Sequence, residues 1–103
     1  SSALGTFASA PPTGGGYWYR MSKASLHMTL INMAKDLKQA GVTVAAINPG
    51  VVYSQKNLDR GGFPADRMVQ VDVAVAGLIN EIDKLSLQDT GSFVDYKGNR
   101  LAW

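Results

Sequence analysis

The chain has 103 residues, of which 46% are hydrophobic and 17% are charged, a composition typical of a globular unit with one modest core. Ten basic residues are scattered among eight acidic ones and the net charge is only +2, so we expect no nucleic-acid partner. The sequence has no cysteine and one histidine, which excludes disulfides and thiolate metal sites and argues against a zinc site.

No apolar run approaches the roughly 20 residues that a membrane-spanning helix needs, and the first residues do not resemble a signal peptide. We therefore expect no membrane partner and a cytoplasmic protein. The chain does not begin with methionine, and residues 1–5 followed by residues 10–16 are typical of a strand end running into a loop. We expect it to be the C-terminal portion of something longer, or a processed product.

Residues 18–40 are predicted to be a helix that Gly41 stops, because apolar side chains recur at helical spacing. These side chains are Leu26, Leu30, Met33 and Leu37. The apolar arc is wide, which predicts burial against a sheet plus a neighbouring helix, or against a second subunit. Residues 42–47 form a β-branched run closed by Asn48, Pro49 and Gly50, which is typical of a buried parallel strand.

Residues 51–70 have no sustained period and are predicted to be a long loop, with room for a helical turn. Residues 71–85 predict a second helix, with Asp72 favourably placed in its first turn. Residues 91–96 alternate apolar and polar side chains before a turn, as an edge strand does. The order helix, strand, loop, helix, strand predicts the α/β class.

Tyr19 and Lys23 are the most informative pair of residues. Their spacing of four puts both side chains on one face of a helix, about one turn apart. A nearby cation favours the ionised form of a phenol, so Lys23 is expected to make Tyr19 a usable proton donor and acceptor. The pattern alone is weak, because any amphipathic helix can carry a tyrosine and a lysine at this spacing.

Three motifs in order carry a resemblance. They are Ser-Ser-Ala-x-Gly at residues 1–5, Tyr-x-x-x-Lys at residues 19–23, and a strand that ends in Asn-Pro-Gly-Val-Val at residues 48–52. Together they resemble the second half of a short-chain dehydrogenase/reductase, and residues 91–103 are similar to its C-factor or sniffer-like branch. The resemblance implies one partial domain over residues 1–103, the C-terminal part of a Rossmann-like doubly wound parallel sheet. The N-terminal nucleotide-binding half is expected to be missing from this chain.

The resemblance also implies an NAD(P)-dependent oxidoreductase of the carbonyl reductase or alcohol dehydrogenase type, acting on a small carbonyl or alcohol. Tyr19 would pass a proton to the carbonyl oxygen, Lys23 would assist it and hold the nicotinamide ribose, and Ser2 would donate a hydrogen bond to the same oxygen. Ser2 precedes Tyr19 by 17 positions, so residues 11–16 must loop outward for the hydroxyls to converge.

Cofactor contacts are implied for Pro49, Gly50, Val51 and Ser54, besides Tyr19 and Lys23, with NADP slightly favoured over NAD. The glycine-rich turn that cradles the pyrophosphate is not in the chain, and Gly14 to Gly16 do not replace it because they follow no strand. The isolated fragment is therefore expected to be inactive.

Other candidate residues have two interpretations each. Tyr17, Trp18 and Tyr53 are possible substrate contacts, although aromatic residues near a helix start more often pack. His27 lies one turn beyond Lys23 and is interpreted as an interior or interface histidine rather than a base. Lys56, Arg60 and Arg67 are interpreted as solvated loop charges, one of which is able to approach a cofactor phosphate.

The alternative function is a non-catalytic binding or interaction module that keeps this part of the fold. In either case the sequence predicts a homo-oligomer, formed through the helix at residues 18–40 and through the C-terminal helix and strand. No metal site is expected.

A half-sheet exposes a strand edge and an apolar face, so the 103-residue chain by itself is expected to associate, to aggregate or to need its missing partner. Light scattering on the purified chain tests this expectation. A sharp, monodisperse monomer would contradict it.

Overall fold

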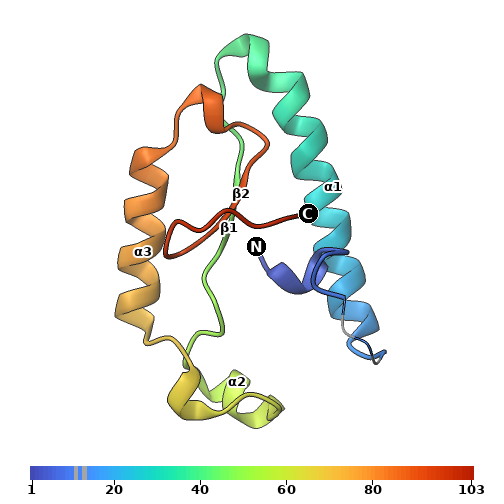
Figure 1. The fold of residues 1–103 in the computed structure, drawn as a ribbon, viewed down its shortest axis with the longest axis vertical. Coiled ribbons are helices and arrows are strands. Elements are labelled where there is room, and N and C mark those ends of the chain that lie inside the picture. Colours follow the sequence, from blue (N-terminus) through green and yellow to red (C-terminus); the bar gives the residue numbers. More distant parts are fainter. Residues whose placement is uncertain (11, 13) are drawn as a thin grey trace.

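The computed structural model describes residues 1–10, 12 and 14–103. The helices are α1 (Tyr17–Leu37), α2 (Gln55–Arg60) and α3 (Val71–Lys84), and the strands are β1 (Ala46–Asn48) and β2 (Phe93–Asp95). Four 3-10 turns complete the description: η1 (Ala3–Gly5), η2 (Lys38–Ala40), η3 (Ala65–Arg67) and η4 (Leu87–Asp89). The two strands lie between α1 and α3 (Figure 1), which confirms the α/β class.

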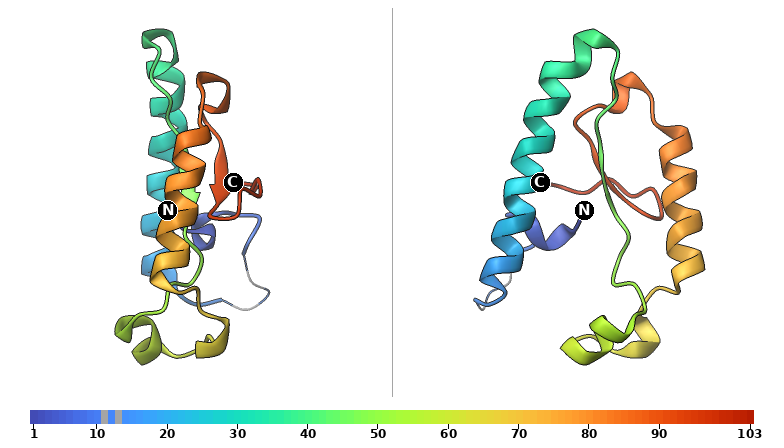
Figure 2. Two further views of the ribbon diagram at one scale, coloured as in Figure 1. Left: turned by 90° about the vertical axis from the view of Figure 1, so that its left-hand side faces the viewer. Right: turned by 180° about the vertical axis from the view of Figure 1, so that it is seen from behind.

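β1 and β2 pair in parallel, with Ala46 opposite Phe93 and Asn48 opposite Asp95. The connection between them contains α3, as a parallel pair requires. The main-chain nitrogen of Ser1 donates to the carbonyl of Ile47 over 2.5 Å, on β1. Seen edge-on in Figure 2 the molecule is a thin slab, with extents of 43 × 30 × 19 Å.

The predicted helix over residues 18–40 is confirmed as α1 followed by η2, and Gly41 ends it in the left-handed conformation with φ +76°. The strand prediction was partly wrong: the regular strand covers Ala46–Asn48 rather than residues 42–47. Strand register depends on the partner, and β2 offers only three residues of regular pairing. The main chain of Val44 lies outside this pairing: its amide donates a hydrogen bond to the Thr90 hydroxyl, and its carbonyl accepts one from the Gly91 amide.

The segment between β1 and α3 has more structure than the predicted loop. α2 forms there because the Ser54 side chain accepts a hydrogen bond from the Asn57 amide, over 3.2 Å, and so caps the helix start. A parallel bridge between Val52 and Val69 closes the base of the segment. The outward loop predicted at residues 11–16 includes Pro11 and Thr13, which lie outside the described residues.

Gly77 lets α3 pack closely on the turn that follows β2. A Cβ atom at this position would lie 2.4 Å from the carbonyl oxygen of Tyr96 and 3.1 Å from its Cβ. The Tyr96 ring reaches across to Gly50, where an added Cβ would lie 3.2 Å from Cε1. One tyrosine therefore contacts both α3 and the turn after β1.

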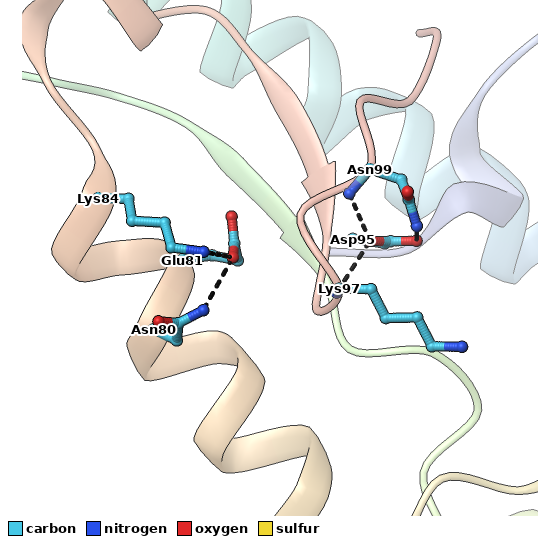
Figure 3. A network of polar contacts seen from close by, with 6 residues as sticks. All are labelled: Asn80, Glu81, Lys84, Asp95, Lys97 and Asn99. Carbon is cyan, nitrogen blue, oxygen red and sulfur yellow. Dashed lines mark hydrogen bonds and ion pairs between the residues drawn. The ribbon is translucent and has the colours of Figure 1, made fainter.

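The turn after β2 is held by the Asp95 carboxylate, which accepts hydrogen bonds of 2.9 Å from the Lys97 amide and from the Asn99 amide and side chain (Figure 3). Burial alone raises the pKa of Asp95, but these hydrogen bonds outweigh burial and leave the pKa below its ordinary value. Glu81 of α3 lies beside the same turn, with its carboxylate 2.7 Å from Lys84 Nζ.

Little apolar surface is buried by the chain itself. The described buried hydrophobic residues are Ala34, Ala46, Met68, Ala74, Phe93 and Val94. Large apolar side chains stay exposed along α1 and α3, among them Met28 at 59% and Ile82 at 56%. An exposed apolar surface of this extent is typical of an interface.

Replacing Gly77 with alanine tests the packing of α3. Alanine is the better helix former by roughly 1 kcal/mol, yet we expect Gly77→Ala to lower the free energy of unfolding by about 1–3 kcal/mol, because the methyl group meets the Tyr96 main chain. The measurement is denaturant unfolding of the protein at full natural length. Ala76→Gly, at an exposed position of α3, calibrates the helix propensity. A stabilised Gly77→Ala variant would contradict the packing.

Candidate active site

One cavity of about 500 Å³ lies where η1, the start of α1, the turn after β1 and the end of α2 meet. Its lining residues are Ser2, Ala3, Leu4, Tyr19, Asn48, Gly50, Val51, Asn57, Arg60, Gly61, Gly62 and Phe63. Segments far apart in the sequence thus share one cavity at the carboxyl end of β1. This is the edge at which open α/β sheets bind ligands.

Ser2 is the N-cap residue of η1, and its hydroxyl oxygen accepts a hydrogen bond of 3.3 Å from the Leu4 amide. A hydroxyl has one hydrogen to donate besides its acceptor sites. Because this cap uses only an acceptor site, the Ser2 hydrogen remains available to a ligand in the cavity.

Gly5 fixes the distance between η1 and α1. A Cβ atom at this position would lie 2.5 Å from Lys23 Cβ, 2.6 Å from the Lys23 carbonyl carbon and 2.9 Å from the Ala24 nitrogen. Only a residue without a side chain permits such an approach. Arg20 adds a hydrogen bond of 3.2 Å from Nη1 to the Leu4 carbonyl. The two contacts hold Ser2 on the side of α1 that carries Tyr19.

Tyr19 and Lys23 lie on the same face of α1, as their spacing predicts. Lys23 Nζ is 5.5 Å from the centroid of the Tyr19 ring, within the range of a cation–π contact. Tyr19 lines the cavity, and Lys23 lies beside it at the base of η1.

Gly50 and Val51 form the opposite wall. Gly50 has φ +77°, a conformation that favours glycine, and an added Cβ would lie 3.0 Å from Val69 Cγ2. The main chain is therefore bare where it faces the cavity. Asn48, which ends β1, also lines this wall.

Arg60 is a cavity residue that the sequence did not single out. Its Cζ atom is 5.2 Å from the centroid of the Tyr19 ring, so Arg60 is a second cation, besides Lys23, within cation–π range of this ring. It was interpreted as one of three loop charges, and nothing local in the sequence separates it from Lys56 or Arg67. Only the folding of α2 toward α1 brings it there.

Comparison with known proteins agrees with this architecture. The chain is 36% identical over 103 residues to the C-signal of Myxococcus xanthus and 37% identical over 92 residues to 1-hydroxy-2-glutathionyl-2-methyl-3-butene dehydrogenase of Rhodococcus sp. strain AD45. The first alignment includes 100% of this chain and 58% of the C-signal. The second includes 88% of this chain and 39% of the dehydrogenase. No family model matches the chain.

Two solved structures are similar over the whole chain, each with a TM-score of 0.85 and 28% identity. They are the NADPH-bound carbonyl reductase from chicken fatty liver and the carbonyl reductase Sniffer of D. melanogaster, of which the chain covers 40% and 39%. The chain therefore resembles the short-chain dehydrogenases/reductases over its whole length, as its motifs indicate. It corresponds to the C-terminal part of these reductase structures, which confirms the predicted part of a Rossmann-like fold. The chain spans between 39% and 58% of the length of these proteins.

Not every residue implied by the reductase resemblance lines the cavity. Ser54 uses its hydroxyl oxygen to cap α2, and Pro49 adjoins the lining residues Asn48 and Gly50. Tyr17 lines a different cavity of about 350 Å³. Neither cavity is lined by Trp18, which is 84% exposed, or by Tyr53. The cofactor and substrate roles of these residues stay predictions.

His27 occupies the interior position that was predicted for it. Its ring is 4% exposed, and its centroid is 5.0 Å from the ring centroids of both Phe93 and Trp103. Its Nε2 atom and the Ser1 hydroxyl are joined by a hydrogen bond of 2.5 Å. Burial lowers the pKa of His27, and the positive charge of Lys23 lowers it further.

Within the described part of the chain, no helix combines the length and apolarity that a bilayer crossing requires. The described His, Asp and Glu side chains also form no group of three or more that is able to hold a metal ion.

The lowered pKa of His27 predicts a pH dependence of stability. The folded state holds this proton less tightly than the unfolded state, whose pKa is near 6.5, so unfolding takes up a proton below that pH. The contribution of His27 to the free energy of unfolding is fully present above pH 6.5. Below that pH the free energy of unfolding falls, by at most about 1.4 kcal/mol per pH unit.

Denaturant unfolding of the full-length protein between pH 7.5 and pH 5.5 measures this loss. The His27→Gln variant, which keeps a polar partner for Ser1, should show a smaller loss over the same range. Equal slopes for the two proteins would contradict the assignment to His27.

Proposed function

We propose that the protein containing this chain is an NAD(P)-dependent reductase of small carbonyl compounds, and that residues 1–103 form its catalytic half as a single partial domain. The observation that carries the proposal is that Ser2 and Tyr19 line one cavity while Lys23 lies 5.5 Å from the Tyr19 ring. Similarity to a dehydrogenase and to two carbonyl reductases of the same fold supports it.

Tyr19 is proposed as the general acid. As the carbonyl is reduced, negative charge develops on its oxygen, and a positioned hydroxyl lowers the barrier by supplying a proton. The Ser2 hydroxyl would stabilise the same oxygen by donating the hydrogen that its cap contact with Leu4 leaves available. Lys23, with Nζ 5.5 Å from the centroid of the Tyr19 ring, would assist this transfer as the neighbouring cation.

The wall at the end of β1 fits a nicotinamide. Gly50 leaves its main chain bare, and neighbouring side chains already occupy the space on its other side. Pro49, Gly50 and Val51 would line the ring, and Lys23 would hold the adjacent ribose hydroxyls. The bound cofactor supplies the hydride. NADP is slightly favoured over NAD, because one similar structure is an NADPH-bound carbonyl reductase.

Homo-oligomer formation through α1 and α3 is part of the proposal. Exposed apolar side chains support it on α1 (Met28 and Met33) and on α3 (Val75, Ile79 and Ile82). These faces lie away from the cavity lining, so assembly would leave the cavity accessible.

Two substitutions test the catalytic assignment. In the full-length protein, Tyr19→Phe and Lys23→Met should each lower kcat for carbonyl reduction by roughly 10²- to 10⁴-fold, because proton transfer loses its donor or the cation that assists it. The measurement is oxidation of NADPH in the presence of an aldehyde.

Ser22→Ala is the matched control. It removes an exposed hydroxyl from the same turn of α1, one that donates to the Tyr19 carbonyl over 2.8 Å, and should leave kcat unchanged. Full activity in Tyr19→Phe would overturn the proposal and favour the non-catalytic binding module.

A further inference from the structure

We propose that Arg60 binds an acidic group of the substrate, so that the preferred substrates are carbonyl compounds that carry a carboxylate. The inference rests on the reductase function proposed above and adds the chemical class of its substrate. It starts from the position of the Arg60 guanidinium, which lies on the cavity wall with Cζ 5.2 Å from the centroid of the Tyr19 ring.

The charges around the cavity are of one sign. Its lining residues include Arg60 and no aspartate or glutamate, and Lys23 lies beside it. The carboxylate nearest in sequence, Asp59, accepts a hydrogen bond of 2.8 Å from the Gln55 side chain. Such a cavity favours an anion over a neutral ligand of the same shape.

The guanidinium of Arg60 is free to bind a ligand. Among the described residues it forms no ion pair and no hydrogen bond, since the ion pairs there join Lys84 to Glu81 and Arg100 to Asp89. A guanidinium has five N–H donors in a planar fork that matches a carboxylate. The contact with the Tyr19 ring, with Cζ 5.2 Å from its centroid, uses none of these donors in a hydrogen bond.

α2 is anchored firmly enough to present this side chain. The Ser54 cap holds its first turn, and Asn57 Nδ2 donates to the Val52 carbonyl over 2.6 Å. Gly61, with φ +63°, ends the helix directly after Arg60. The cavity wall continues through Gly61, Gly62 and Phe63, so Arg60 is one of four consecutive residues that line the cavity.

The position of Arg60 relative to Tyr19 favours a substrate carboxylate over a cofactor phosphate as the anion that Arg60 binds. In the proposed reaction the Tyr19 hydroxyl faces the carbonyl oxygen, and the guanidinium lies against the ring that carries this hydroxyl. An anion held by Arg60 is therefore close to the reacting carbonyl. The other basic residues of the segment, Lys56 and Arg67, do not line the cavity.

The test compares 4-formylbenzoate with its methyl ester, as substrates of the full-length protein with NADPH. Arg60→Gln should lower kcat/KM for the acid by roughly 10- to 100-fold, as expected for loss of a charged hydrogen-bonded pair, and change the ester by less than about threefold. Lys56→Gln removes a cation from the same helix outside the cavity and should change neither substrate.

Equal losses for acid and ester in Arg60→Gln would overturn the proposal. A raised KM for NADPH with both aldehydes affected alike would also overturn it, because the guanidinium would then serve a cofactor phosphate.

Calorimetric binding of benzoate, with benzamide as the neutral match, gives a readout that needs no turnover. Arg60→Gln should weaken benzoate binding by roughly tenfold or more and leave benzamide unchanged. Unchanged benzoate binding would overturn the acidic subsite. If neither aldehyde is reduced while benzoate binding depends on Arg60, the reductase function fails and the anion site stands.

Discussion

The approach of the Gly5 main chain to the backbone of α1 at Lys23 is the contact on which the candidate site depends. At this distance no side chain fits, so η1 is seated directly on the helix that carries Tyr19 and Lys23. Ser2, three positions earlier in the chain, is thereby placed on the cavity that Tyr19 lines. Two residues with hydroxyl groups, 17 positions apart in sequence, thus line one cavity, as the proposed general acid catalysis with oxyanion stabilisation requires.

The parallel pairing of β1 and β2 supplies the second half of the site. It brings the turn after β1 beside the turn after β2, where Tyr96 packs between Gly50 and Gly77. The positive φ of Gly50 leaves bare main chain on the cavity side of this contact. The packing of α3 is therefore coupled to the shape of the proposed nicotinamide wall, although α3 does not line the cavity.

The cavity has two walls of different origin. One consists of η1, the start of α1 and the end of β1, and it contributes Ser2 and Tyr19. The other consists of α2 and the glycines after it, and it contributes Arg60. Reaction type and substrate class are thus proposed to reside on separate segments, which is a common arrangement where loops on a rigid scaffold carry specificity.

The sequence by itself determined the features that depend on local spacing. These are α1 and its stop at Gly41, α3, the common face of Tyr19 and Lys23, and the motifs by which the family is recognised. Strand limits depended on the pairing partner, so residues 42–47 predicted β1 only in part. The cap of α2 at Ser54 was readable but was not used. Arg60 was decided by tertiary structure alone, because its charge acquires a role only when α2 folds against Tyr19, a residue 41 positions away in the chain.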